Sequence, residues 1–231
     1  MESYLFSPDT KMADIFHSNL SLATLMPRFG IAFGFGDKSI AQCCQEHKLN
    51  CDFFLLVCNV YTFPAYLPDR KQILLTDMSN LLPFLSASHE YYLNGRLAHI
   101  ENHWKNIIGN ADRAFQQVLL RFFAEYKDEV QKHFEYEEQV VFPYINLLQN
   151  AQTANPNSSF KIEQFEKNHS NIEDKLKDFI NIILKYLPGT LKTEDRMSVL
   201  YDIDRLSSDL NRHSLIEDKI LVPYVKYLEE K

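Results

Sequence analysis

The C-terminal two thirds of the sequence contain an internal repeat, in which residues of the first half recur in the second half at a constant offset in residue number. Five residues recur with the same identity at this offset: His89 as His169, His133 as His213, Glu137 as Glu217, Pro143 as Pro223 and Tyr144 as Tyr224. Each half contains one upstream histidine that the repeat preserves and, at the same distance downstream, a His-x-x-x-Glu motif followed by an apolar pair and a proline. Such a chain is expected to fold as two copies of one helical pair, which limits the fold strongly.

Four long helices are predicted after about residue 77. Residues 84–142 contain only two glycines and no proline, and apolar residues recur there with the period of an amphipathic helix. The predicted helices are 80–108, 112–149, 160–187 and 194–229. Four long helices joined by short loops favour an all-α fold, an antiparallel up-and-down four-helix bundle. Pro143 and Pro223 are expected to kink or locally end the second and fourth helices.

The first third is expected to form a small helical domain of its own. Glycine and proline are frequent before residue 70, which predicts short helices joined by turns. Two such helices are predicted at 39–47 and 50–61, and each opens with a residue that can cap it. The predicted domains are residues 1–62, a linker at 63–76 with two prolines, and the bundle at 77–231.

The two His-x-x-x-Glu motifs fall on the predicted core face, because positions i and i+4 lie on one side of a helix. In the fourth helix the motif fills the two missing places of an apolar series: Leu206, Leu210, His213, Glu217, Ile220, Tyr224. The second helix has the same series: Tyr126, Val130, His133, Glu137, Val140, Tyr144. His89 and His169 lie in comparable apolar series on the first and third helices. The bundle interior is therefore expected to contain four histidines and two glutamates.

A metal centre would explain this interior. Burying two uncompensated carboxylates costs several kcal/mol each, and no lysine or arginine occupies a neighbouring core position on the second to fourth helices. Six nitrogen and oxygen donors, two of them carboxylates that can bridge, are typical of a dinuclear iron or manganese site, whereas zinc needs only four. A single His-x-x-x-Glu motif is usually a surface pair, but two copies in register with a repeat are hard to explain in that way.

The segments 133–143 (HFEYEEQVVFP) and 213–223 (HSLIEDKILVP), together with the isolated His89 and His169, resemble the hemerythrin-like four-helix bundle. They are most similar to the di-iron proteins of iron–sulfur cluster repair, the RIC family, and the resemblance covers nearly the whole chain. It implies two iron ions joined by an oxo or hydroxo bridge. Manganese or zinc can substitute for the iron. It further implies that His89, His133, His169 and His213 bind iron and that Glu137 and Glu217 bridge the two metals.

The N-terminal third also resembles that family, with one departure. Residues 28–31 (RFGI) and 38–41 (KSIA) are similar to the family's short N-terminal domain, but the usual pair of adjacent cysteines is replaced by 33–37 (FGFGD). The four cysteines of this chain are Cys43, Cys44, Cys51 and Cys58. In a reducing compartment they are expected to be packing residues rather than disulfides.

The resemblance implies a role in the stress response, either iron donation to damaged iron–sulfur clusters or the handling of nitric oxide. The expected partners are O₂ or NO as small ligands and damaged iron–sulfur proteins. The alternative is a hemerythrin-like module that binds or senses O₂ or NO without turnover. A metal-binding repair protein is favoured over a classical enzyme, and no catalytic residue is assigned. A ferritin-like oxidase is disfavoured because such sites use Glu-x-x-His pairs.

Charge and hydropathy exclude other classes. With 24 basic against 31 acidic residues the net charge is −7, which argues against a nucleic-acid partner. No apolar run approaches the roughly 18 residues of a membrane span, and the N-terminus shows no secretory signal, so a cytoplasmic protein is expected. The N-terminal segment before the linker is also expected to offer an apolar face for a homodimer.

Two further histidines, His99 and His103, continue the helical series that contains His89. Their counterparts in the second half are Phe179 and Ile183, which breaks the symmetry of the repeat. They are therefore interpreted as supporting, bundle-end or surface residues, with a role as supplementary ligands as the alternative. Glu138 follows a bridging glutamate and should point about 100° away from it, toward solvent or toward the outer side of a ligand.

Overall fold

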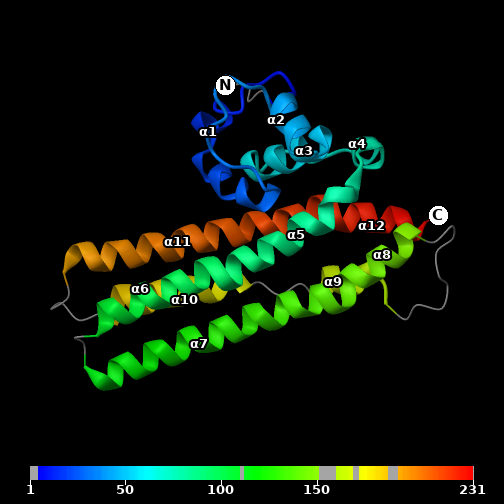
Figure 1. Ribbon diagram of the computed structural model, residues 1–231. Helices are drawn as coiled ribbons and strands as arrows, with labels where there is room; N and C mark the ends of the chain where they lie inside the picture. The colour runs from blue at the N-terminus through cyan, green and yellow to red at the C-terminus, as the bar shows by residue number, and fades with distance from the viewer. Residues whose placement is uncertain (1–4, 110–111, 151–159, 169–171, 187–191, 231) are drawn as a thin grey trace. The chain divides into compact units, whose positions relative to one another are not determined.

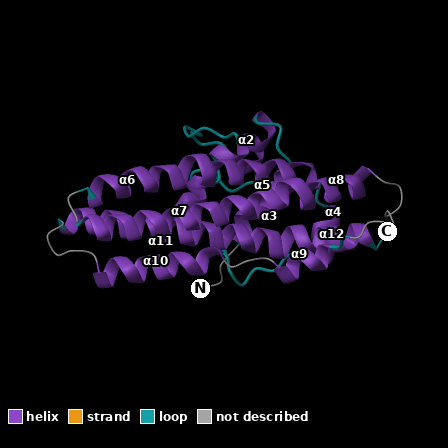
Figure 2. Ribbon diagram, turned by 90° about the horizontal axis from the view of Figure 1, so that it is seen from below, coloured by secondary structure: helices purple, strands orange, loops and turns teal. Residues whose placement is uncertain are grey.

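The computed structural model describes residues 5–109, 112–150, 160–168, 172–186 and 192–230. Regular structure in these ranges is helical apart from one antiparallel bridge between Lys11 and Ser39 (Figures 1 and 2), so the predicted all-α fold is confirmed. The chain divides into two compact units. Unit 1 comprises residues 1–88, 144–167 and 212–231, and unit 2 comprises residues 89–143 and 168–211.

The N-terminal part of unit 1 is built from short helices. They are α1 (Ile15–Ser18), the 3₁₀ helices η1 (Leu20–Thr24) and η2 (Pro27–Phe29), α2 (Ile40–Glu46) and α3 (Cys51–Thr62). A capping box opens α2, since Ser39 Oγ accepts from the Gln42 N–H and the Gln42 side chain accepts from the Ser39 N–H. Asn50 caps α3 by accepting from the Phe53 N–H at 2.8 Å. Both predicted helices and their caps are confirmed.

The predicted linker contains a helix, α4 (Arg70–Leu75), which the sequence interpretation missed. Asp69 caps it by accepting from the Gln72 N–H at 2.7 Å. The two prolines that suggested a linker both precede this cap, where they do not interfere with helical hydrogen bonds. The 3₁₀ helix η3 (Met78–Asn80) and helix α5 (Leu81–Glu90) follow. The domain boundaries at 62 and 77 stay a prediction.

Three further helices belong mainly to unit 1: α8 (Phe142–Asn150), α9 (Ile162–Asn168) and α12 (Val222–Glu229). One carboxylate joins them, because Glu229 Oε1 accepts from the Tyr144 hydroxyl at 2.6 Å and from the Ile162 N–H at 3.0 Å. Lys226 adds an ion pair to Glu166 at 2.7 Å. These hydrogen bonds and this ion pair connect the ends of the second, third and fourth predicted helices within unit 1.

Unit 2 contains most of four long helical segments that lie side by side in Figures 1 and 2. They are η4 with α6 (Tyr91–Leu97, Ala98–Ile108), α7 with η5 (Arg113–Tyr136, Glu137–Val141), α10 (Ile172–Tyr186) and α11 (Thr193–Ile216). Their shared core is aromatic at one point, where Phe179 meets Trp104 at 5.4 Å, Phe122 at 5.2 Å and Phe123 at 5.8 Å between ring centroids. The four predicted long helices correspond to these segments and their continuations in unit 1.

Within the described residues, three segments are π-helical: η4, η5 and η6 (Glu217–Leu221). At the ends of η5 and η6 the N–H groups of Phe142 and Val222 donate to the carbonyls of Glu137 and Glu217, five residues earlier. Pro143 and Pro223 come next, and neither has the N–H that an α-helical turn would need there. The local interruption predicted at the two prolines is therefore present, in the form of a π turn.

A π turn holds one residue more than an α turn, which changes the positions that a helix buries. At η6 the predicted core residue Ile220 stays fully buried, but the buried positions shift at η5 and after His89. Val140, predicted to be in the core, is 38% exposed, whereas the next residue, Val141, is fully buried. After His89 the core runs through Leu97, Ile100 and Trp104. The prediction that His99 and His103 share the face of His89 is therefore wrong.

Candidate metal centre

His89, His133 and Glu137 come together in unit 2. His89 is the penultimate residue of α5, His133 lies in the last turn of α7, and Glu137 is the first residue of η5. The Nε2 atoms of His89 and His133 lie 2.9 Å from Oε2 and Oε1 of Glu137, respectively. The carboxylate is fully buried, and each of its oxygen atoms faces one imidazole.

The second half repeats this arrangement in unit 1. His213 lies in the last turn of α11 and Glu217 is the first residue of η6. The Nε2 atom of His213 lies 3.3 Å from Oε1 of Glu217, and both side chains are buried. His169, the remaining predicted ligand, lies outside the described residues.

Four of the six predicted ligands are buried: His89 and Glu137 in unit 2, and His213 and Glu217 in unit 1. Together with His133, which contacts Glu137, they are called the buried His/Glu group. The role of each side chain as a ligand stays a prediction.

The donor set fits a divalent metal ion. Donors about 2.1 Å from a metal in neighbouring octahedral positions are about 3.0 Å apart, close to the separations of 2.9 Å and 3.3 Å between imidazole and carboxylate atoms. The same separations also suit hydrogen bonds between imidazole and carboxylate. Imidazole and carboxylate without thiolate suit iron or zinc better than copper(I) or a cluster.

The ring of His89 is fixed from two further directions. Its Nδ1 atom lies 2.8 Å from Oε1 of Glu138, and its face stacks on Phe134 with ring centroids 4.2 Å apart and on Phe142 at 5.6 Å. A carboxylate behind a metal-binding histidine sets the tautomer and raises the basicity of the ring. Glu138 thus lies on the outer side of a predicted ligand, one of the two places expected for it.

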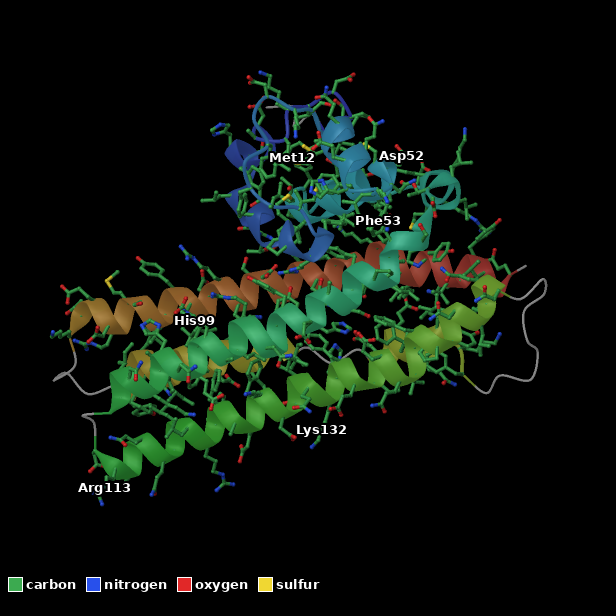
Figure 3. All side chains as sticks on the ribbon, viewed as in Figure 1. Met12, Asp52, Phe53, His99, Arg113 and Lys132 are labelled. Atoms are coloured by element: carbon green, nitrogen blue, oxygen red, sulfur yellow. The ribbon has the colours of Figure 1, made fainter. Side chains whose placement is uncertain are left out.

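Sequence analysis missed a second group of donors in unit 2. His99 and His103 of α6 lie with Asp202 of α11, and one donor atom from each residue lies within 4.8 Å of the others. Figure 3 labels His99 on α6. The four-residue spacing of the histidines was visible in the sequence, but Asp202, 99 residues beyond His103, carried no signal.

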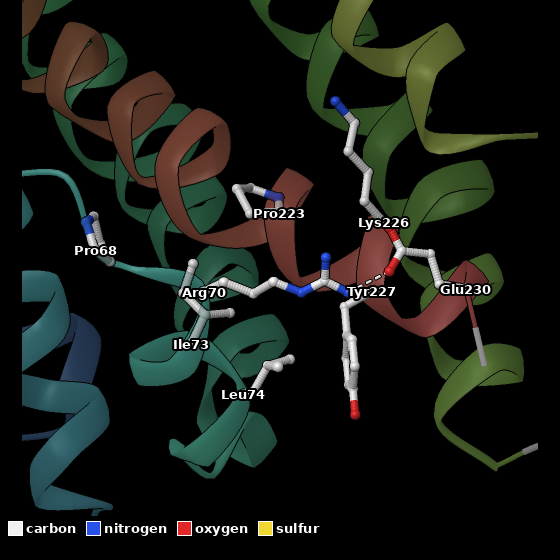
Figure 4. A pocket seen from close by; sticks show the side chains of 8 residues that line it. All are labelled: Pro68, Arg70, Ile73, Leu74, Pro223, Lys226, Tyr227 and Glu230. Atoms are coloured by element: carbon white, nitrogen blue, oxygen red, sulfur yellow. Dashed lines mark hydrogen bonds and ion pairs between the residues drawn. The ribbon is translucent and has the colours of Figure 1, made fainter.

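A cavity of about 240 Å³ in unit 1 has no part in either group (Figure 4). It is lined by Pro68, Arg70, Ile73, Leu74, Pro223, Lys226, Tyr227 and Glu230. The Arg70 guanidinium forms an ion pair with Glu230 and lies 5.8 Å from the centroid of the Tyr227 ring. Since none of the predicted ligands lines it, the cavity is separate from the candidate metal centre.

The thiols are placed as expected for packing residues. Cys43, Cys44 and Cys58 are buried, Cys51 is half-buried, and all four are free. Burial raises the pKa of each thiol. The turn that replaces the expected cysteine pair instead carries an aromatic contact, in which Phe35 stacks on Phe16 at 5.7 Å.

No described helix combines the length and the apolar character needed to cross a membrane. A comparison with curated proteins finds no significant match. Residues 81–225, more than half of the chain, match the family model for the hemerythrin HHE cation-binding domain. This range contains both His-x-x-x-Glu motifs, both upstream histidines and the three π turns. The chain therefore belongs to the hemerythrin HHE cation-binding family.

Proposed function

We propose that this chain is a non-haem di-iron protein that takes part in the repair of iron–sulfur clusters damaged by nitrosative or oxidative stress. The observation that carries the proposal is the set of two imidazoles that contact one fully buried carboxylate in the first half, His89, His133 and Glu137. Two histidines and one carboxylate with open positions are the set that non-haem ferrous iron uses. The sequence repeat supplies a second such set, His169, His213 and Glu217.

In this proposal each set holds one iron ion, and the two glutamates are shared between the ions. An iron pair held there would supply reversible change between ferrous and ferric iron and open positions for O₂ or NO. The chain itself contributes the buried carboxylates and the contact of Glu138 with His89 Nδ1, which would direct Nε2 toward the ion.

The charge of the donor set supports iron donation. Four neutral imidazoles and two carboxylates carry two negative charges against four positive charges on two ferrous ions. A carboxylate-rich or thiolate site would balance more of that charge and hold ferrous iron more tightly. The predicted set therefore favours an iron store that can be emptied.

The second candidate function is a module that binds or senses O₂ or NO without losing its iron. The observation that favours it is the turn at residues 33–36. Gly34 and Gly36 have φ values of 108° and 59° there, and the flanking aromatic rings of Phe33 and Phe35 pack on each other at 5.9 Å. This chain has no thiol at that place, so a repair reaction that needs thiols there could not take place.

Metal analysis tests the centre itself. The protein, reconstituted anaerobically with ferrous iron, should bind about two iron ions per chain and show near-ultraviolet bands of a bridged pair after oxidation. Both should be lost in the Glu137→Ala/Glu217→Ala variant. Glu135→Ala, which removes an exposed acid of α7 that accepts from the Gln131 side chain, is the control. One iron ion or none in the wild type would overturn the di-iron proposal.

Iron transfer separates the two functions. Protein loaded with ⁵⁷Fe is incubated with a [4Fe–4S] protein whose cluster has been damaged by peroxide or NO. Repair predicts that ⁵⁷Fe appears in the target cluster and leaves this chain. Retention of all ⁵⁷Fe, with a reversible spectral change on addition of NO or O₂, would favour the binding module.

A further inference from the structure

His99, His103 and Asp202 form a second donor group that lies wholly within unit 2. The two histidines are one turn apart on α6, with ring centroids 5.9 Å apart. Both face one oxygen atom of Asp202 on α11: His103 Nδ1 lies 2.8 Å from Oδ2 and His99 Nε2 lies 3.5 Å from it. Three donors of metal-ligand type thus converge from two neighbouring helices.

The surroundings leave room for an ion with bound water. The group lines an open cavity of about 480 Å³, and the exposed fractions of the side chains are 58% for His99, 28% for His103 and 15% for Asp202. Asn102, Asn106 and Ser198 complete the lining. Because His99 is mostly exposed, it can adjust by the small amount that separates the present contacts from metal–ligand distances.

Neighbouring side chains orient the donor atoms of His103 and Asp202. The Ser198 hydroxyl lies 3.3 Å from His103 Nε2, so that this nitrogen has a partner and Nδ1 is directed at Asp202. Arg96 contacts the other carboxylate oxygen, Oδ1, at 3.4 Å, which leaves Oδ2 to the two histidines.

We propose that His99, His103 and Asp202 bind a divalent transition-metal ion, with Zn²⁺ as the best match, and that water completes the coordination. Two imidazoles and one carboxylate plus water form an open tetrahedral zinc site, and two histidines at i and i+4 on a helix are a known zinc-binding spacing. Magnesium and calcium prefer oxygen donors throughout. Glu101, between the histidines, bonds to Lys105 and Lys127 instead of facing the group. The site is independent of the proposed di-iron function.

The inference is tested by comparing the zinc bound per chain in the wild type and in two variants. The full-length protein is dialysed against Zn²⁺ at micromolar free concentration, and bound zinc and iron are counted per chain. His99→Ala removes a mostly exposed ligand and should leave the fold intact by circular dichroism. It should bind one zinc ion fewer than the wild type, or bind that ion at least tenfold more weakly. His17→Ala, which removes an exposed imidazole of unit 1, should bind as the wild type does.

The difference between these two variants does not depend on what occupies the buried His/Glu group, so failure of the di-iron proposal leaves the test valid. A second variant, His103→Gln, should repeat the loss. Equal zinc content in His99→Ala and His17→Ala would overturn the inference. So would zinc that binds the wild type only by displacing iron ion for ion, because the zinc would then occupy the other centre.

Discussion

The Nδ1 atom of His89 lies 2.8 Å from a carboxylate oxygen of Glu138. The preceding residue, Glu137, faces the opposite nitrogen of the same ring at 2.9 Å. Two consecutive acidic residues therefore hold one imidazole from both sides, at the start of the π turn η5. Both carboxylate contacts thus come from the first two residues of one turn.

Glu138→Ala should weaken iron binding by about 10- to 100-fold, because the imidazole loses the carboxylate that orients it. Glu138→Gln keeps an acceptor oxygen and should recover most of the affinity. Competition with a chromogenic ferrous chelator measures the effect, and Glu135→Ala on the same helix is the control. An unchanged affinity in Glu138→Ala would mean that the contact with His89 has no role in metal binding.

Pro143→Ala should stabilise the metal-free protein by about 1 kcal/mol, because alanine restores an N–H donor and favours an α turn in place of η5. The same change should weaken iron binding, since Glu137 begins that turn. Denaturant unfolding of the metal-free protein and chelator competition measure the two effects.

Pro223→Ala gives an internal check on this prediction, because η6 and Glu217 repeat the arrangement in the second half. Both variants should change stability and affinity in opposite directions. If stability rises while iron affinity stays constant, the prolines do not maintain the geometry of the glutamates.

Trp104→Phe should change the free energy of unfolding by less than about 1 kcal/mol. The Trp104 side chain is fully buried, and its indole N–H has no hydrogen-bond acceptor in the part of the chain that the structure describes. Removing an unsatisfied donor relieves about 1–3 kcal/mol, which offsets the loss of ring volume. Trp104→Ala leaves a cavity and should cost about 3–5 kcal/mol. A phenylalanine variant as destabilised as the alanine variant would show that the N–H has a partner.

Alkylation of the four cysteines at pH 7.5 should be at least about tenfold slower in the folded protein than in guanidinium chloride. Burial raises each thiol pKa, which lowers the fraction of reactive thiolate at a given pH. Cys51, the half-buried thiol, should react first by mass mapping. Rapid modification of Cys44 or Cys58 would contradict this order.

The long helices and the caps Ser39 and Asn50 could be predicted because their signals are local. Amphipathic periodicity and capping residues act within a few positions of the backbone that they affect. The pairing of His133 with Glu137 was also accessible, since the i and i+4 positions of a helix lie on one face. The helix α4 was missed because its cap, Asp69, was outweighed by the prolines before it.

Beyond the first ligands, the burial of Ile220 and Tyr144 was predicted and is confirmed, but a π turn is set by one extra residue and leaves no periodic signal of its own. Val140 was assigned to the core, and His99 to the face of His89, by counting in α-helical steps across such turns. The structure buries Val141 and Ile100 instead. The group of His99 with Asp202 depends on this shift and on the packing of two helices, and neither can be read from one segment of sequence.

The π turns also make helix length a determinant of the centre. Removing the extra residue from 139–141 or 219–221 would turn a wide turn into an ordinary one, and the helix before and after it would keep its buried face. Removing a residue from an α turn between two ligands would instead rotate everything downstream by about 100° against the ligand before it. The two halves can keep their constant offset only while both retain the additional residue. In this chain the count of residues between ligands is as much a part of the metal centre as the ligands themselves.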